Sequence, residues 1–447
     1  MKHLLALAAT TALIWTAPVL AQNSSTSPDL AKAVAADYDK ELKALFLDFH
    51  KNPELSYKET RTAGIIAKKW RDAGFTVTEK VGGTGVVAVM KNGEGPTLML
   101  RADMDGLPLV EDSGLDYMST VKQVSVDGEE KPVMHACGHD VHITSLIGTA
   151  NQMAARKDQW AGTLVLIAQP AEERIGGAKL MMDDGLYSRF PKPDFALAFH
   201  VSADTPTGML ALGEGIESSS SDSVDIIVHG VGAHGASPHR GKDPILMGAE
   251  IIMALQTIIS REIAPLKPGV ITVGSFHSGF KHNIISDKAT MQLTVRSDDE
   301  DTRAKLLAGI KRIATNVGRM NGMPEDKLPE VLVSHESTPA NYNDAALTKR
   351  VKGVFAARFG EDVFDNQPRE GMGAEDFAYF VEPNTDVPGV YFQVGGTPQA
   401  DFDREKAGGA PVPSHHSPFF KISPRESVTL GTEAMTAAAL DLLSKQD

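Results

Sequence analysis

Two continuous apolar runs constrain the fold of this chain most strongly. Residues 163–168 and 195–199 lack the alternation of apolar and polar residues that marks a strand with one solvent-facing side. Such runs are typical of strands buried on both faces of a largely parallel sheet. Helical periodicity occurs before them, at residues 42–50 and 63–73. This alternation of helices and strands predicts an α/β fold.

A turn signal separates two further expected strands. Asn92-Gly93 lies between residues 86–91 and residues 97–101, and Asn-Gly is a favoured turn sequence between strands. The α/β pattern is interrupted after residue 214 and resumes near residue 341. It ends in a helix expected at residues 426–444.

The interruption predicts an inserted domain. A serine run at residues 218–221 is suited to a hinge, and Asp243-Pro244 predicts a helix start. Expected strands and a second helix lie at residues 223–230, 270–276, 290–295 and 303–317, the last being the helix. This β-α-β-β-α-β order resembles a ferredoxin-like unit. We therefore expect a mixed, largely parallel α/β catalytic domain at residues 30–215 and 337–447, with a ferredoxin-like α+β domain inserted at 216–336.

Length and charge limit the classes of function. With 447 residues the chain is too long for one ordinary core, which agrees with two domains. The net charge of −14 argues against a nucleic-acid partner, because phosphate binding needs a concentrated basic surface. A small-molecule substrate is the expected partner.

The N-terminus predicts export. A basic start at residues 1–3, an apolar stretch at 4–14 and a cleavage site at 19–21 fit a secretory signal peptide. The apolar stretch is too short to span a bilayer comfortably. We expect residues 1–21 to be removed and the mature protein to be periplasmic or secreted, with no membrane partner.

Five potential metal ligands lie in four separated segments, each near the end of an expected strand. They are Cys137 and His139, Glu173, His200, and His416. In open α/β sheets, binding sites lie at the carboxyl ends of strands, so these side chains should meet at one edge. Imidazole and thiolate suit zinc, manganese, nickel or cobalt. Five donors exceed the needs of one tetrahedral ion with an open position, which predicts two divalent metal ions.

Acidic residues at the same strand ends strengthen this expectation. Asp103 and Asp105 follow one strand, and Glu172 and Glu173 follow another. If Glu173 is a ligand, Glu172 is free to accept a proton from the attacking water and to return it to a leaving amine. Glu172 is therefore the predicted general base of a hydrolase.

Three alternatives remain open from the residues alone. Cys137, the only cysteine, could act as a nucleophile with His139 or His200 in a metal-free hydrolase. The hinged fold could belong to a catalytically silent periplasmic binding protein, although such a protein has no need of Glu172. The same metal chemistry could also serve an exported dipeptidase or carboxypeptidase.

The combined motifs resemble the di-metal aminoacylase/carboxypeptidase family of amidohydrolases, which includes hippurate hydrolase and the indole-acetyl-amino-acid hydrolases. The resemblance rests on residues 101–108 (Arg-Ala-Asp-Met-Asp-Gly-Leu-Pro), 135–140 (His-Ala-Cys-Gly-His-Asp) and 169–173 (Gln-Pro-Ala-Glu-Glu). It extends from residues 50–56 to residues 416–418. It implies cleavage of the amide bond of N-acyl amino acids, the same five ligands, and the same base.

The resemblance also implies roles for the inserted domain, as a lid and as the interface of a homodimer. It suggests that His234 stabilises the tetrahedral oxyanion. Asn283 and Arg296 match positions linked to the acyl group and to the substrate carboxylate. The chain departs from the family pattern at Ser286, and in the bulky residues at 276–282 and the polar insertion at 121–131. Substrate preference is therefore not inherited from the resemblance.

Overall fold

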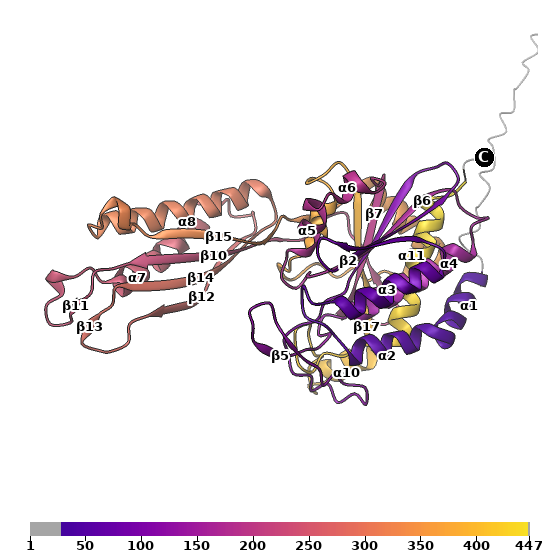
Figure 1. Ribbon diagram of the computed structural model, residues 1–447, viewed down its shortest axis with the longest axis horizontal. Helices are drawn as coiled ribbons and strands as arrows, with labels where there is room; N and C mark the ends of the chain where they lie inside the picture. Colours follow the sequence, from indigo (N-terminus) through magenta and orange to yellow (C-terminus); the bar gives the residue numbers. More distant parts are fainter. Residues whose placement is uncertain (1–27, 446–447) are drawn as a thin grey trace, which may run out of the picture.

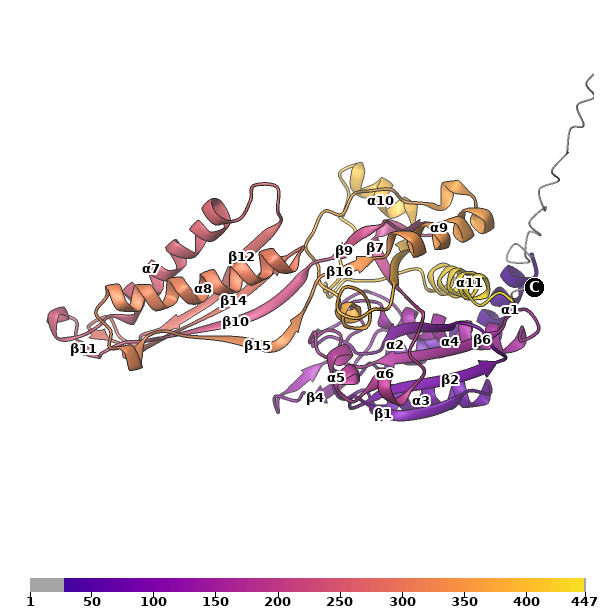
Figure 2. The same ribbon diagram turned by 90° about the horizontal axis from the view of Figure 1, so that it is seen from above.

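The computed structural model describes residues 28–445, which form two bodies joined end to end (Figures 1 and 2). The larger body is built from both ends of the described chain, and the smaller body projects from it. The predicted signal peptide, residues 1–21, lies outside the described residues.

The larger body contains a seven-stranded sheet with the order β1-β2-β6-β3-β7-β17-β8. The four strands β6, β3, β7 and β17 pair in parallel, whereas β1, β2 and β8 pair antiparallel at the two edges. The strands are β1 (Thr76–Val81), β2 (Gly85–Asn92), β3 (Thr97–Asp103), β6 (Gly162–Gln169), β7 (Phe195–Pro206), β8 (Leu210–Ala211) and β17 (Gly389–Thr397). This sheet confirms the predicted α/β class with a largely parallel centre.

The turn at Asn92-Gly93 does not join neighbouring strands. Strand β6 lies between β2 and β3, pairing antiparallel with the first and parallel with the second. The turn between β2 and β3 was recognisable in the sequence. Strand β6, which separates them in the sheet, comes about 60 residues later and forms backbone hydrogen bonds with both. Both expected strands are present, as β2 and β3, but they are not neighbours in the sheet.

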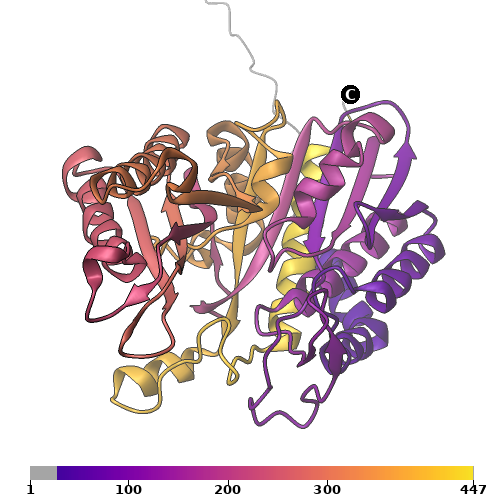
Figure 3. The same ribbon diagram turned by 60° about the vertical axis from the view of Figure 1, so that its left-hand side comes forward.

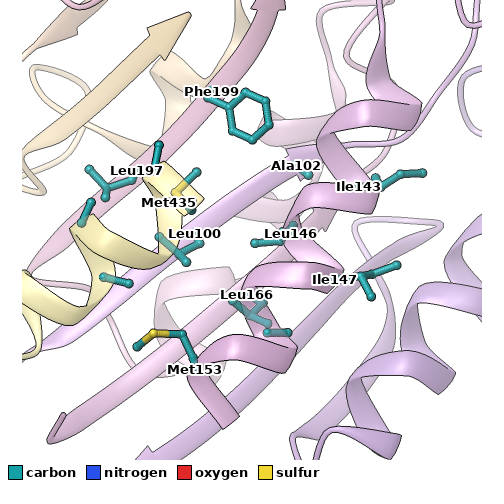
Figure 4. Close-up of a cluster of buried hydrophobic side chains, with 14 of the residues drawn as sticks. Leu100, Ala102, Ile143, Leu146, Ile147, Met153, Leu166, Leu197, Phe199 and Met435 are labelled. Carbon is teal, nitrogen blue, oxygen red and sulfur yellow. The ribbon is translucent and has the colours of Figure 1, made fainter. Parts of the chain in front are cut away.

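Side chains from both faces of the central strands are buried, which explains the continuous apolar runs. Leu100, Leu166 and Leu197 point to one face, where they pack against α4 and α11 (Figure 4). Val165 and Ile167 point to the opposite face and pack against α5, α6 and the segment Asp376–Phe380.

Helices cover both faces of the sheet. The larger layer contains α1 (Pro28–Asp37), α2 (Lys43–Lys51), α3 (Thr60–Asp72), α4 (His139–Ala155), α9 (Ala345–Phe359) and α11 (Pro424–Leu442). The smaller layer contains α5 (Gly177–Asp183) and α6 (Leu186–Arg189). Helix α4 is almost entirely buried because the strands, α2 and α11 surround it.

The smaller body, which we call the lid, has a four-stranded antiparallel sheet in the order β12-β14-β10-β15. Its elements are β10 (Ser220–His229), α7 (Pro244–Thr257), β12 (Gly269–Ser278), β14 (Lys288–Ser297), α8 (Glu300–Met320) and β15 (Glu330–Thr338). Both helices lie on one face of the sheet, where they bury an apolar core (Figure 3). As expected, Asp243 caps α7, accepting from Ile245 N at 2.9 Å.

Two adjacent chain crossings connect the lid to the catalytic body. Strands β9 (Gly215–Ser218) and β16 (Asn341–Asn343) pair antiparallel where the chain enters and leaves the lid. The serine run lies at this crossing, but it is not an exposed linker. Ser219 and Ser220 are buried, and Ser220 Oγ lies 2.7 Å from Ser297 Oγ.

The helical segment Pro244–Glu262 in the lid has the length and composition of a membrane-crossing helix, with a mean hydropathy of 1.2. Met247, Ile251 and Leu255 turn into the lid core. Leu246 and Met253 lie on the opposite side and are 54% and 73% exposed. Burial in the lid core therefore accounts for one side of this apolar helix, and the other side remains an exposed apolar face.

Candidate metal centre

The carboxyl ends of the parallel strands deliver the predicted side chains to one edge of the sheet. Strand β3 ends at Asp103, and β6 ends just before the segment that carries Glu172 and Glu173. The sequence suggested that His200 is the last residue of its strand, but β7 continues to Pro206. Strand β7 pairs with β3 only as far as Ala198, and its pairing with β17 extends the strand beyond that point.

The five predicted ligands converge although they come from four separated segments. Cys137 Sγ lies 3.3 Å from His200 Nε2 and 3.3 Å from His416 Nε2. Glu173 Oε2 lies 3.4 Å from His416 Nε2, and its other oxygen lies 3.9 Å from His139 Nε2. Cys137 and His139 are held together by the start of α4, where Gly138 adopts a φ of +84°.

These donors form two overlapping groups. Cys137, His139 and His200 offer ligand atoms within 4.8 Å of one another, and so do Cys137, Glu173 and His416. Cys137 belongs to both groups. Each group alone supplies three protein donors, so the set could hold two cations, with Cys137 among the donors of both groups.

Unpartnered buried atoms support the fit of cations to this cluster. Both ring nitrogens of His139 and the Oε1 atom of Glu173 are buried without a hydrogen-bond partner among the described residues. Leaving such polar groups unpaired is costly unless another species binds them. His200 donates through Nδ1 to Val201 O at 2.7 Å, which leaves Nε2 free for a cation.

A neighbouring donor group is already satisfied and therefore does not compete for a cation. His142 Nδ1 lies 2.6 Å from Asp103 Oδ1, and His142 Nε2 accepts from Val201 N at 2.8 Å. The sequence reasoning missed His142, although it lies three residues after His139 on α4. That spacing places two side chains on the same helix face and was the available signal.

A buried arginine balances part of the negative charge behind the cluster. Arg101 Nη1 donates to Asp103 Oδ2 at 2.6 Å, and Nη2 donates to Glu375 Oε1 at 2.7 Å. Glu375 also accepts from Phe377 N at 2.9 Å and from the hydroxyl of Tyr391. Glu375 is thus held by Arg101, by the backbone of Phe377 and by Tyr391.

The remaining carboxylates are crowded. Burial, together with the charges of Glu375 and Glu173, holds the pKa of Glu172 well above its usual value. Burial raises the pKa of Glu173 to about 8 and also raises the pKa of the Cys137 thiol. Burial lowers the pKa of His139, but Asp103 and Asp105 outweigh this and raise it to about 10. Burial is the main cause for Glu172, Glu173 and Cys137, and nearby negative charge adds to it; divalent cations would favour the ionised forms of all three groups.

Glu172 lies next to the cluster but outside the two groups that share Cys137. Its Oε2 atom lies 3.9 Å from His139 Nε2, and the residue is 7% exposed. It also lies within 4.8 Å of donors on His139 and Glu173, and of donors on Glu375 and Asp376. Glu375 and Asp376 both accept hydrogen bonds from Arg101, so they form a salt-bridge network beside Glu172.

A buried histidine outside the predicted set supports the start of α4. His50 Nδ1 lies 2.7 Å from Asp140 Oδ2, and His50 Nε2 lies 3.1 Å from Glu111 Oε1. Asp140 directly follows the predicted ligand His139. In the sequence, residues 50–56 were notable only as the start of the family resemblance, and no role was predicted for His50.

The polar insertion at residues 121–131 forms a hairpin that contacts Arg174, the residue after Glu173. Its strands are β4 (Lys122–Val124) and β5 (Glu130–Pro132). Asp127, at its tip, accepts from Arg174 Nη1 at 3.0 Å, and Arg174 Nε also donates to Glu336 Oε1 at 2.7 Å. One arginine, adjacent to Glu173, thus joins the insertion to the lid strand β15.

His234 and Asn283 do not reach the cluster within one chain. His234 lies in β11 (Ala233–His234), and Asn283 directly precedes β13 (Ile284–Ile285), at the end of the lid farthest from the catalytic body (Figure 1). Both line a pocket of about 610 Å³ together with Phe280. Arg296 lies at the opposite end of the lid sheet, opposite Ser221 and close to the chain crossing.

Known proteins show the same family pattern along the chain. Residues 99–418 match the peptidase family M20/M25/M40. Thermostable carboxypeptidase 2 of Saccharolobus solfataricus is 37% identical over 374 residues, covering 83% of this chain and 88% of the relative. Hippurate hydrolase of Campylobacter jejuni is 37% identical over 347 residues, covering 77% and 86%.

A solved structure agrees with the fold and comes from a protein described as binding two metal ions. A dinuclear metal-binding peptidase of the M20 family from Bacillus subtilis superposes with a TM-score of 0.71 at 27% identity, covering 92% of this chain and 99% of its own. The family resemblance inferred from the motifs is confirmed. The chain belongs to the M20 peptidase family of hydrolases.

Proposed function

We propose that this protein is a metal-dependent amidohydrolase that cleaves N-acyl amino acids to a carboxylic acid and a free amino acid. The observation that carries the proposal is the pair of three-donor groups that share Cys137, with the buried carboxylate of Glu172 beside them. The named relatives include a hydrolase of hippurate, which supports an N-acyl amino acid as substrate.

The residues would hold two divalent cations, with Cys137 common to both sites. One cation would be held by His139 and His200 and the other by Glu173 and His416. When bound, such ions polarise an amide carbonyl and make water a better nucleophile at neutral pH. The donor set suits zinc, manganese, nickel or cobalt better than magnesium or calcium.

Glu172 carries the proton-transfer step. Its carboxylate is buried beside the donor groups, with Oε2 3.9 Å from His139 Nε2, where it can reach a water molecule held at the cluster. It accepts a proton from the attacking water and donates it to the nitrogen of the scissile amide as the amine leaves. Asp105 fixes the backbone of this residue by accepting from Glu172 N at 3.1 Å.

Arg296 is suited to the carboxylate of the amino-acid product. Its Nε atom donates to Thr294 Oγ1 at 3.1 Å, and Asp222, the nearest acidic influence on its pKa, is engaged by Arg303 at 2.7 Å. Because Asp222 pairs with Arg303, the positive charge of the Arg296 guanidinium remains available to a substrate carboxylate. A planar fork of this kind binds a carboxylate with two parallel hydrogen bonds.

A peptidase is the second candidate. The relative from Saccharolobus solfataricus is named a carboxypeptidase, and a dipeptide offers the same amide and terminal carboxylate. The metal-free cysteine hydrolase is disfavoured, because burial and nearby carboxylates raise the pKa of Cys137 and so suppress its thiolate.

Substrate choice is tested by release of free amine. The mature protein, reloaded separately with manganese, zinc, cobalt or nickel, is assayed with N-benzoylglycine, N-acetyl amino acids and unblocked dipeptides. We expect cleavage confined to the N-acyl amino acids, and its loss after treatment with a chelator. Preferential cleavage of dipeptides would assign the chain to the peptidase alternative, and chelator-resistant cleavage would contradict the metal mechanism.

We also propose that the mature protein is exported to the periplasm or secreted, after removal of residues 1–21, and that it dimerises through the lid. The exposed apolar face of α7, with Leu246 and Met253, and the unpaired edge of β12 support the dimer. A second copy would also explain how His234 and Asn283, at the lid tip, serve a metal centre.

Native mass spectrometry of protein recovered from the expressing cells tests both points at once. The expected species is a dimer of chains that begin at Gln22. A Met253→Glu variant should be monomeric, because it places a charge in the apolar contact, whereas Lys311→Glu on the exposed side of α8 should remain dimeric. A monomeric wild-type protein would contradict dimerisation, and an intact residue 1 would contradict cleavage.

A further inference from the structure

The segment that carries Glu172 and Glu173 leaves β6 in a conformation that residues with a Cβ rarely adopt. Ala171 has a φ of +50°, and its carbonyl oxygen accepts from Gly177 N at 3.2 Å. A Cβ on Gly177 would lie 1.6 Å from Pro170 O, so the turn is too tight to relax locally. The direction of both glutamates therefore depends on what holds Ala171.

Two buried acidic side chains accept three consecutive backbone N–H groups of this segment. Ala171 N donates to Glu59 Oε1 at 2.8 Å. Glu172 N and Glu173 N donate to the two carboxyl oxygens of Asp105, each at 3.1 Å. Glu59 and Asp105 are 0% and 1% exposed, so water does not replace these bonds.

Glu59 holds a second left-handed residue with the same oxygen atom. Tyr57 has a φ of +66°, and its N–H donates to Glu59 Oε1 at 2.9 Å. The phenol of Tyr57 lies over the turn: a Cβ on Gly176 would lie 2.7 Å from its hydroxyl oxygen. The other oxygen of Glu59 accepts from Thr84 Oγ1 at 2.5 Å. The Glu59 side chain thus links two backbone positions of positive φ, Tyr57 and Ala171, through hydrogen bonds to the same oxygen atom.

We propose that Glu59 is a positioning residue of the active site, which keeps Ala171 in the left-handed conformation and thereby aims the carboxylates of Glu172 and Glu173. Its effect on catalysis rests on the proposed function, in which Glu172 is the general base. Glu59 thereby gives the segment at residues 53–59 a role in supporting the turn that carries Glu172 and Glu173.

The variants Glu59→Ala and Glu59→Asp test the proposal. The first removes the acceptor, and the second withdraws it by one methylene group. We expect each to lower kcat by about 100-fold with little change in KM, because small displacements of a reacting group cost about this much. Glu59→Gln should retain most of kcat, since its amide oxygen can accept from both Tyr57 N and Ala171 N.

Glycine at position 171 separates positioning from general stability. Glycine adopts positive φ without the Cβ penalty, so Ala171→Gly should restore part of the lost kcat in the Glu59→Asp background. Thr84→Val, which removes only the bond to the other oxygen of Glu59, should keep kcat close to the wild-type value. A loss of kcat that Ala171→Gly does not restore would overturn the proposal, because Glu59 would then act through a different contact.

A structural measurement keeps this test independent of the reaction. In a crystal structure of Glu59→Asp, or of Glu59→Ala, we expect residue 171 to leave the left-handed region and the Glu172 side chain to change direction. An unchanged φ at residue 171 would overturn the proposal even if activity fell. If the wild-type protein cleaves no amide, the proposed function fails, while the value of φ still decides the role of Glu59.

Discussion

Replacing Glu172 by glutamine should lower kcat by about 10³- to 10⁴-fold while the protein still binds two metal ions per chain. The amide has nearly the same shape as the carboxyl group but cannot accept the proton that the reaction requires. Metal content should persist because Glu172 lies outside the two donor groups that share Cys137. Single-turnover kinetics and elemental analysis of the same preparation measure the two quantities.

The Glu172→Gln substitution should lower kcat but should not lower the melting temperature of the metal-free protein. In metal-free protein, burial near Glu375 and Glu173 penalises the ionised form of Glu172, so a neutral amide at this position should raise or preserve the melting temperature. Glu370→Gln, at an exposed loop position, is the matched control and should leave kcat unchanged. A Glu172→Gln enzyme that kept more than a tenth of the wild-type kcat would remove Glu172 from the role of base.

Replacing Cys137 by alanine should reduce metal content more than the loss of any other single predicted ligand. Its sulfur belongs to both donor groups, whereas His200 and His416 each belong to one. We expect Cys137→Ala to retain fewer than one ion per chain after dialysis, and His416→Ala to retain about one. Elemental analysis gives the stoichiometry. The increase in melting temperature on adding metal gives a second measure, because ligands that bind the native state stabilise it.

His415, next to the predicted ligand His416, provides a matched control for this experiment. His415 Nε2 accepts from Ala203 N at 3.0 Å, and His415 is absent from both groups that share Cys137. His415→Ala should therefore cost folding stability but keep two ions. Two ions retained by Cys137→Ala would refute a shared thiolate ligand.

The sequence identified the elements whose information is local. Continuous apolar runs predicted β6 and β7, because a strand buried on both faces cannot alternate. Convergence of the predicted ligands followed from the rule that parallel strands end at one edge, which holds whatever the details of packing. The N-cap at Asp243 depended on two adjacent residues and was equally accessible.

Contacts between distant segments were not accessible in the same way. The insertion of β6 between β2 and β3 is a choice among pairings that local sequence does not rank. The roles of Arg101 and Glu59 depend on which groups meet them after folding, and each residue looks ordinary in its own segment. The position of His234 at the far end of the lid follows from the length of the lid strands, which the motif around it does not encode.

The place of β17 in the catalytic sheet has a consequence for synthesis of the chain. This strand pairs with β7 but follows the whole lid in sequence, so a ribosome completes the lid before the partner of β7 exists. Until then β7 presents an unpaired edge, the kind of surface that recruits other chains into aggregates. The lid, whose strands and helices are contiguous in sequence, can assemble during this interval. The insertion therefore lengthens the time for which the nascent catalytic sheet needs protection.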